Sequence, residues 1–310
     1  MIIVVSLNPA IDTMYLMENF GAGKVQRPVK VLRSAGGKGM NVARVATCLG
    51  EQVCLTGLIG GANGSSFEKM ARQSGIKTCL LPIEGETRIC INVVDGKTGE
   101  CTEILEKGPT VQKKEYDLFL EQYDALLKEA TVVVLSGSLP RGLPADAYRS
   151  LIRMAKQQKI SVLLDTSGEA LLEGIKEIPT AIKPNEDEMA ELFPKVSANP
   201  SNLGKELLNL YCQGIHFPMV SMGKDGVLVP MEKDILQYSL PLDQVINTVG
   251  SGDAFMAGLA VGIHRGYEEH EILTLACACG SANTQFQETG YVEQELVKKF
   301  RTLVEVKKVL

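Results

Sequence analysis

Two glycine-rich segments of this chain each lead into a stretch with helical periodicity, and one of them carries a carboxylate at the start of that stretch. Segment 247–258 reads NTVGSGDAFMAG, with Asp253 directly after Gly250, Ser251 and Gly252. Glycines let the backbone approach a ligand closely, and the free N–H groups at a helix start attract anions. Phosphoryl transfer needs such donors, together with a carboxylate that accepts the proton of the attacking hydroxyl. The alternative is an ordinary acid in a first helical turn.

The other glycine-rich segment, 35–46, reads AGGKGMNVARVA and precedes a predicted helix that ends at Gly50. It is not a Walker loop, because Lys38 is followed by Gly39 and not by Ser or Thr. It is not a dinucleotide fingerprint either, because it does not follow the first strand directly. The segment therefore predicts either a backbone cradle for a ligand or a tight turn between a strand and a helix.

Short apolar runs alternate with helical patterns along the whole chain, such as 145–157 and 203–213. This alternation predicts βαβ units, and hence a three-layer α/β core with a mostly parallel central sheet. The strand-like runs are 2–7, 132–135, 161–164, 180–182, 219–221 and 227–229.

A different strand pattern occurs at 87–95, which reads TRICINVVD and alternates between polar and apolar residues. Such alternation is typical of a half-exposed strand. A turn at 95–99, a return strand at 100–105 and an extended segment at 13–32 would complete a small antiparallel sheet. We expect this sheet to be an inserted lid and its apolar face to pair two subunits in a homodimer. The apolar residues of that face are Ile89, Ile91 and Val93. The expected lid spans 10–35 and 85–106, and the core spans 1–9, 36–84 and 107–310.

The composition excludes several classes of protein. Of the 310 residues, 45% are hydrophobic and 22% charged, which is typical of a globular protein and not of a disordered or fibrous one. A net charge of −5 gives no overall attraction for nucleic acid or an anionic membrane. The eight cysteines form no C-x-x-C pair, which indicates reduced thiols in a cytoplasmic protein. No apolar stretch reaches the ~20 residues that span a bilayer.

Together with four further segments, the two glycine-rich segments resemble the signatures of the ribokinase-like (phosphofructokinase-B type) carbohydrate kinases. The four are LNPAID at 7–12, SGSLP at 136–140, KPNEDE at 183–188 and SMGKDG at 221–226. All six occur in the order of the family, so the resemblance covers the whole chain. The segments GETR at 85–88 and TEILEKGP at 102–109 resemble the branch of tagatose-6-phosphate kinases and 1-phosphofructokinases.

This resemblance implies an ATP-dependent kinase that converts a ketohexose monophosphate into a bisphosphate. Tagatose-6-phosphate is the first expected substrate and fructose-1-phosphate the second. A kinase of a neutral sugar, or a sugar-phosphate sensor without turnover, is the remaining alternative. An intact Asp253 argues against the sensor, since a sensor needs no base.

The resemblance also implies a role for individual residues. Asp253 would be the base, and Gly250, Ser251 and Gly252 would hold the charge of the transferred phosphoryl group. The implied sugar-side residues are Asp12, Gly37, Lys38, Asn41, Arg88 and Ser138, with Arg27 and Cys90 as weaker candidates. The alternative for Arg27 is a solvated charge on the lid, and the alternative for Cys90 is a packed thiol. The implied ATP-side residues are Lys183, Asn185, Ser221, Gly223, Gly226 and Asn283, with Asn185 and Glu188 organising Mg²⁺ through water.

Overall fold

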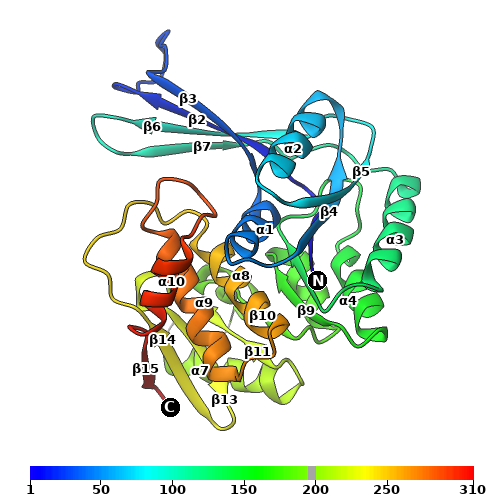
Figure 1. Cartoon of the computed structure of the whole chain (residues 1–310), viewed down its shortest axis with the longest axis vertical. Coiled ribbons are helices and arrows are strands. Elements are labelled where there is room, and N and C mark those ends of the chain that lie inside the picture. The colour runs from blue at the N-terminus through cyan, green and yellow to red at the C-terminus, as the bar shows by residue number, and fades with distance from the viewer. Residues whose placement is uncertain (195–199) are drawn as a thin grey trace.

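The structure is a computed structural model of the chain, and it describes residues 1–194 and 200–310, without the side chains of 200 and 201. Its centre is a parallel sheet of seven strands in the order β11-β10-β9-β8-β1-β4-β5 (Figure 1). The strands are β1 (Ile2–Ser6), β4 (Val53–Ile59), β5 (Lys77–Pro82), β8 (Val132–Ser136), β9 (Ser161–Asp165), β10 (Ala181–Ile182) and β11 (Phe217–Pro218).

Helices cover both faces of this sheet, because its inner strands are apolar on both sides. In β1, Ile2 and Val4 belong to one buried cluster, and Ile3 and Val5 to the other. The first cluster packs against α1 (Lys38–Cys48), α2 (Gly61–Gln73), α8 (Ser251–His264), α9 (Glu269–Asn283) and α10 (Gln294–Arg301). The second packs against α3 (Lys113–Leu127), α4 (Ala147–Gln157), α5 (Gly168–Ile175), α6 (Glu186–Leu192) and α7 (Pro200–Cys212). The predicted three-layer α/β fold is confirmed.

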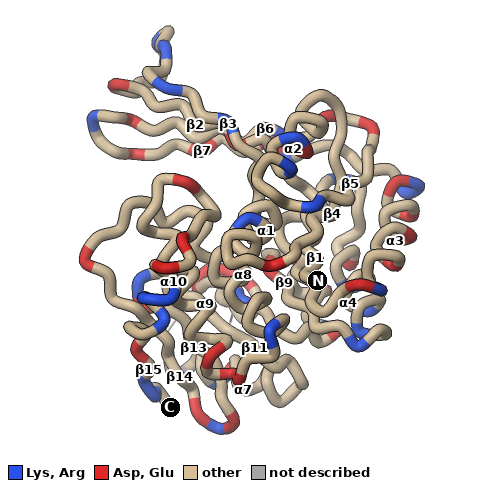
Figure 2. The backbone as a smooth tube through the Cα atoms, in the orientation of Figure 1, with Lys and Arg blue, Asp and Glu red and all other residues tan. Residues whose placement is uncertain are grey.

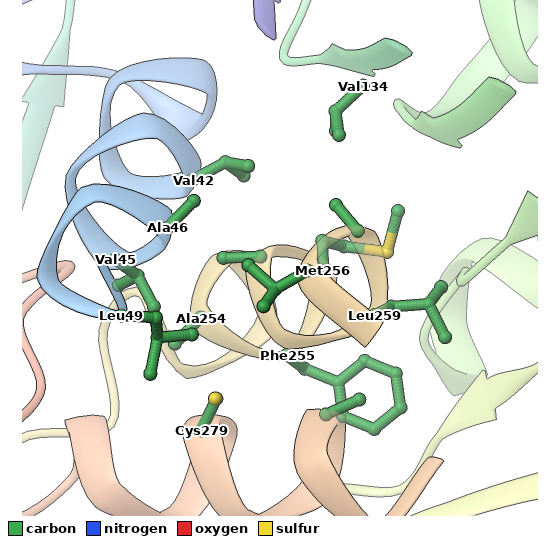
Figure 3. Close-up of a cluster of buried hydrophobic side chains, with 14 of the residues drawn as sticks. Val42, Val45, Ala46, Leu49, Val134, Ala254, Phe255, Met256, Leu259 and Cys279 are labelled. Atoms are coloured by element: carbon green, nitrogen blue, oxygen red, sulfur yellow. The ribbon is translucent and has the colours of Figure 1, made fainter. Parts of the chain in front are cut away.

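The packing of α8 between α1 and α9 fixes where two helices begin (Figure 3). Small residues bring α8 close to α9, since a Cβ at Gly258 would lie 2.8 Å from the Cα of Ala276. On the other side, Val42, Val45 and Ala46 of α1 face the same buried cluster. Because close-packed interiors barely yield, the starts of α1 and α8 keep a fixed relative position.

A second sheet projects from the core, with the order β3-β2-β6-β7 (Figure 1). Its strands are β2 (Ala10–Met17), β3 (Lys30–Gly36), β6 (Arg88–Asp95) and β7 (Cys101–Leu105). We refer to it as the lid sheet. It is not fully antiparallel, because the central strands β2 and β6 run parallel. Both of these strands leave the core at the same end, so only their return strands can be antiparallel. Whether the lid forms a separate domain with the boundaries given above stays a prediction.

The apolar residues of the lid sheet are distributed differently from our expectation. Val93 is only 8% exposed, and Ile89 packs against the buried cluster of the core. Neither residue therefore needs a second subunit to cover it. The exposed apolar residues within the lid strands lie on the two edge strands: Val31 and Leu32 on β3, and Ile104 and Leu105 on β7. The loop between β2 and β3 adds Phe20, Val25 and Val29.

A third sheet, which the sequence did not indicate, is antiparallel and follows the central one in the chain. It comprises β12 (Val220–Ser221), β13 (Val227–Met231), β14 (Asp234–Ser239) and β15 (Glu305–Lys308). We expected 219–221 and 227–229 among the strands that alternate with helices. Only two residues separate β13 from β14, and such a turn forces antiparallel pairing because it leaves no room for a crossover helix.

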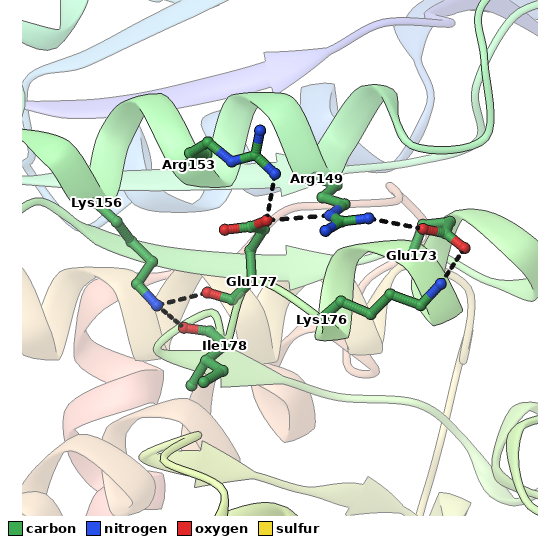
Figure 4. Close-up of polar contacts among 7 residues, drawn as sticks. All are labelled: Arg149, Arg153, Lys156, Glu173, Lys176, Glu177 and Ile178. Atoms are coloured by element: carbon green, nitrogen blue, oxygen red, sulfur yellow. Dashed lines mark hydrogen bonds and ion pairs between the residues drawn. The ribbon is translucent and has the colours of Figure 1, made fainter.

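An ionic network joins α4 to the connection that follows α5 (Figure 4). Glu177 accepts hydrogen bonds from Arg149 Nε at 3.0 Å and from Arg153 Nη2 at 2.6 Å. Lys156 Nζ donates to the carbonyl oxygens of Glu177 and Ile178. Ile178 has φ +54°, an unfavourable conformation for a β-branched residue. The network therefore holds a strained connection that leads into β10.

Charged residues of both signs are interspersed along the outer helices and loops (Figure 2). In this view, blue and red residues are mixed and do not separate into regions of one sign, in keeping with the small net charge of −5. Within the described ranges, no helix combines the length and the apolar character that crossing a bilayer requires.

Candidate active site

Asp253 lies in the first turn of α8, where the predicted carboxylate is now found buried. The residue is 6% exposed, and its Oδ2 accepts a hydrogen bond of 2.8 Å from Asn41 Nδ2. Burial raises the pKa of Asp253 to about 7, and the neighbouring Asp165 carboxylate adds to the rise. Lys38, the Asn41 hydrogen bond and Lys183 oppose it. A carboxyl group with such a pKa is suited to accept a proton near neutral pH.

The carboxyl ends of two neighbouring parallel strands, β9 and β10, lie beside Asp253. Asp165 ends β9, is 2% exposed and pairs with Lys38 Nζ at 3.2 Å. Although burial opposes it, Lys38 and then Lys183 hold the pKa of Asp165 below its usual range. Lys183 follows β10, is 6% exposed, and its Nζ would lie 3.3 Å from a Cβ at Gly252. Two ammonium groups and two carboxylates are therefore gathered at the start of α8.

The turn before α8 has the conformation that an anion cradle needs. Gly250 caps the helix with φ +81°, and a Cβ there would come within 2.7 Å of Thr289 Cγ2. Asn283 holds this turn in place, because its Nδ2 donates to the Val249 carbonyl and its Oδ1 accepts from Gly290 N. The side chain of Asn283 is fully buried in these contacts. We expected Asn283 at ATP, but it supports the turn and does not line the cleft described below.

The lid brings further candidates toward this centre. Asp12 of β2 faces the backbone at Gly36, where a side chain would overlap its carboxylate. Burial raises the pKa of Asp12 to about 6, while Arg44 and Arg88 oppose the rise. Asp12 pairs in register with Cys90 of β6. Asp12, Cys90 and Arg88 consequently share one face of the lid sheet.

Arg88 is held in place by the backbone at the base of the lid. Its Nε and Nη2 donate to the Asn8 carbonyl at 3.2 and 3.0 Å, and its Nη1 donates to the Glu106 carbonyl at 3.1 Å. Since a guanidinium has five N–H groups, two remain for an anion. Ser138 is exposed next to this group, and its Oγ accepts a hydrogen bond from Asn8 Nδ2.

A cleft of about 490 Å³ lies on the other side of the α8 start. Its polar part includes Lys183, Asn185, Ser221, Gly223, Gly226, Ser251 and Gly252. Its apolar part includes Val227, Leu240, Leu242, Val245, Phe255 and Cys277. This division suits a nucleotide, with phosphates at the polar part and the base at the apolar part. A bridge between Asn185 and Ser221 brings two of the predicted segments together at its edge.

Asn185 and Glu188 form a capping box at the start of α6. Asn185 Oδ1 accepts from Glu188 N at 2.8 Å, and Glu188 Oε2 accepts from Asn185 N at 2.9 Å. Glu188 Oε1 has no role in the box. In the described part of the chain, no three His, Cys, Asp or Glu side chains form a metal cage. A magnesium site at Glu188 would accordingly be completed by water and phosphate oxygens, as Mg²⁺ tolerates.

The family model described as "pfkB family carbohydrate kinase" matches residues 3–295. The chain belongs to the pfkB family of carbohydrate kinases. It is accordingly a phosphotransferase, as the sequence predicted, and ATP is the co-substrate that this family implies.

Individual relatives of this pfkB kinase agree with the family. Among curated proteins, a tagatose-6-phosphate kinase of Staphylococcus epidermidis is 38% identical over 309 residues, which cover 99% of both chains. Among solved structures, a Thermotoga maritima protein described as a possible 1-phosphofructokinase has a TM-score of 0.90 at 26% identity. The alignment covers 100% of this chain and 99% of that one. Phosphofructokinase-2 of Escherichia coli has a TM-score of 0.90 at 24% identity, over 97% and 98% of the two chains.

The structure gathers most of the predicted site residues and separates a few. Asp253, Asn41, Lys38, Lys183 and the Gly250 turn meet at the start of α8, with Gly37 capping α1 nearby. Arg27 instead lies exposed in the loop between β2 and β3, at the end of the lid sheet that points away from the core (Figure 1). Cys90 is half-buried, and burial raises the pKa of its thiol, so a reactive thiolate is not favoured there.

Three neighbours of the site were missed by reasoning from the sequence. Asp165 was detectable, because an acid that ends a buried parallel strand lies at the edge where ligands bind. Asn8 lay in a quoted motif but was given no role. Arg44 had no signal of its own, since its contacts join segments that are far apart in the chain.

The raised pKa of Asp253 predicts a pH dependence of the kinase. A base must be deprotonated to accept a proton, so kcat should rise with pH and level off above about pH 7. A pH profile of kcat at saturating substrates measures this. An acidic limb near the ordinary pKa of a carboxyl group, about 4, would show that Asp253 does not limit turnover.

Proposed function

We propose that this kinase transfers the γ-phosphoryl group of ATP to a hydroxyl of a ketohexose monophosphate, converting tagatose-6-phosphate to tagatose-1,6-bisphosphate. One observation supports a phosphorylated acceptor above all: the guanidinium of Arg88 is fixed on the lid face that also carries Asp12. The 38% identity to a tagatose-6-phosphate kinase over the full chain supports the choice of sugar. Fructose-1-phosphate is the second candidate, favoured by the similarity to a possible 1-phosphofructokinase.

Each step of this transfer is given to a residue of the site. Asp12 and Asn41 bind sugar hydroxyls, and Gly37 and Lys38 lie beside them. Ser138 and Arg88 bind the phosphate of the sugar. Asp253 accepts the proton of the attacking hydroxyl as the new O–P bond forms. The backbone N–H groups of Gly250, Ser251 and Gly252 stabilise the charge of the transferred group. Its bond to the ADP oxygen then breaks, and the lid sheet excludes water that would hydrolyse ATP.

The donor nucleotide is assigned to the cleft beside α8. Lys183 is placed at its phosphates, because its buried ammonium lies next to Gly252. Gly223, Gly226 and the hydroxyl of Ser221 line the same part of the cleft. Phe255 and Cys277 offer an apolar surface to the base. Mg²⁺ would neutralise phosphate charge, and we assign it to Glu188 and Asn185 through water. The region between Glu188 and the start of α8 is acidic, because Asp165, Asp253 and Glu188 all raise the pKa of the Lys38 ammonium group.

Replacing Arg88 with Ala tests the assignment of the phosphosugar. A charge-assisted hydrogen bond contributes about 1.5–3 kcal/mol, so the KM for the phosphosugar should rise by roughly ten- to a hundredfold. The KM for ATP should stay nearly constant, because Arg88 does not line the nucleotide cleft. Steady-state kinetics with each substrate varied in turn measures both values.

The matched control is Arg33→Ala, which removes an exposed arginine from β3 of the same sheet. Arg33 pairs with Thr13, and side chains alternate along a strand, so it lies on the opposite face from Asp12. Both KM values should stay near wild type in this variant. Equal increases of the two KM values in Arg88→Ala would remove the residue from phosphate recognition.

A sensor that binds phosphosugar without turnover is separated from a kinase by ADP release. With Mg-ATP and tagatose-6-phosphate together, the proposal predicts ADP in proportion to the bisphosphate formed. Binding of the sugar phosphate without any acceptor-dependent ADP would instead identify a sensor.

We also propose a homodimer that pairs through the lid, together with the division into core and lid given above. Exposed apolar side chains on both edge strands support the pairing, since edge strands readily pair with other chains. Sedimentation equilibrium should give twice the mass of 33.6 kDa; a monomer at micromolar concentration would contradict this.

Eight unpaired cysteines support a cytoplasmic location.

A further inference from the structure

Arg44 connects three parts of the site that come from distant segments. It lies on α1, one turn after Asn41, and is half-buried. Its Nη1 donates to Asn41 Oδ1 at 3.2 Å and to the Thr289 carbonyl at 2.7 Å. Its Nη2 donates to the Ala35 carbonyl at 2.6 Å, at the end of lid strand β3. One guanidinium therefore joins the lid, α1 and the segment that packs on the Gly250 turn.

The contact with Asn41 determines which end of that amide faces the base. An amide has one accepting oxygen and one donating nitrogen, whereas a guanidinium can only donate. With Arg44 on its oxygen, Asn41 must present Nδ2 to Asp253, and it does so at 2.8 Å. The flipped amide would place its oxygen against the carboxylate and its NH₂ against the guanidinium, so both contacts would be repulsive. Arg44 thus selects the orientation in which Asn41 donates to Asp253.

The contact with Thr289 supports the same centre from the other side. A Cβ at Gly290 would lie 2.7 Å from the Cβ of Asn41, so this backbone packs directly on the amide. The same segment packs on the turn before α8, because a Cβ at Gly250 would lie 2.7 Å from Thr289 Cγ2. A displaced Thr289 carbonyl would loosen both the amide and the turn.

We propose that Arg44 is a positioning residue for phosphoryl transfer, which holds the Asn41 amide against Asp253 and the 289–290 segment against the Gly250 turn. It touches neither substrate in this account and acts only through its neighbours. The inference rests on the proposed role of Asp253 as the base. It goes beyond that role by assigning the geometry of the base to a residue on another element.

The test compares Arg44→Gln with wild type by the pH profile of kcat. The groups that face Asp253 are Asp165 of β9, Lys38 and Asn41 of α1, and Lys183 after β10. Since the Asn41 hydrogen bond lowers the pKa of Asp253, its loss should move the acidic limb upward by about one pH unit. Misplacement of the base should lower kcat by roughly ten- to a hundredfold. Arg44→Lys, which keeps the charge and fewer donors, is the milder second variant and should show a smaller shift.

Arg265→Gln is the matched control, because Arg265 Nη2 donates to the Leu49 carbonyl at the other end of α1. This variant should lose thermal stability without moving the acidic limb. In an Asn41→Ala background, Arg44→Gln should cost kcat much less than it does in wild type, since the amide it orients is gone.

Two results would overturn the inference, and they are distinguishable from each other. An unshifted acidic limb, or losses that simply add in the double variant, would leave Arg44 a structural residue while Asp253 keeps its role. High turnover in Asp253→Asn would remove the base itself, and the role of Arg44 would fall with it.

Discussion

Asp253→Asn should reduce kcat by roughly 10²–10⁴-fold, the usual contribution of a positioned general base. Asparagine keeps the size of the side chain and an oxygen that accepts from Asn41, but it cannot accept the proton of the attacking hydroxyl. Because Asp253 is buried and its pKa is raised to about 7, a neutral replacement should leave the protein at least as stable at pH 8. Stopped-flow or coupled-assay kcat, together with thermal unfolding at pH 8, measures the two effects.

The control for this variant is Asp187→Asn, which neutralises an exposed acid in the first turn of α6 that lines the neighbouring cleft. Its kcat should remain near wild type. If Asp253→Asn retained more than about a tenth of wild-type turnover, far above the loss expected for a general base, another group would have to take the proton.

Lys183→Met should lower kcat by roughly 10²–10³-fold, which is the usual loss when one fixed donor to a developing charge is removed. The ammonium of Lys183 is buried beside Gly252, where the transferred phosphoryl group is proposed to lie. The substitution should also raise the pKa values of Asp253 and Asp165, because Lys183 lowers both. The acidic limb of the kcat profile should therefore move to higher pH.

Lys224→Met is the matched control, since Lys224 lines the same cleft but is exposed. A surface lysine near phosphates should affect the KM for ATP modestly and leave the pH profile in place. The account of Lys183 would be contradicted if the two variants lost similar amounts of kcat.

Much of the fold could be predicted because the chemistry of its core is local in sequence. Apolar runs such as Ile2–Ser6 and Val132–Ser136 alternate with helical patterns, and that alternation specifies a parallel sheet between helices. The third sheet was missed because its last strand, Glu305–Lys308, is exposed and mostly charged. Its position depends on pairing with β14 and not on burial. The parallel pairing of β2 with β6 also follows from where the chain leaves the core, which no local pattern records.

Residues of the candidate site that belong to a sequence motif could be predicted, whereas residues that hold these motif residues in place could not. Asp253, Lys183 and the glycines follow strands or begin helices, so their place at the ligand edge is implied by the fold. The role of Asn283 at ATP stays a prediction; the sequence did not indicate that its amide also holds the backbone at Val249 and Gly290. Arg44 could not be foreseen, since its partners at 35 and 289 come together only in three dimensions.

The most direct test of the central claim is ADP release with Mg-ATP and a panel of acceptors, compared by kcat/KM. The panel is tagatose-6-phosphate, fructose-1-phosphate, fructose-6-phosphate, fructose and ribose. The account predicts that tagatose-6-phosphate exceeds the unphosphorylated sugars by a hundredfold or more, about 2.7 kcal/mol of transition-state discrimination. A preference for fructose-1-phosphate would change the sugar and keep the role of Arg88. A preference for fructose or ribose, or no acceptor-dependent ADP at all, would contradict the account.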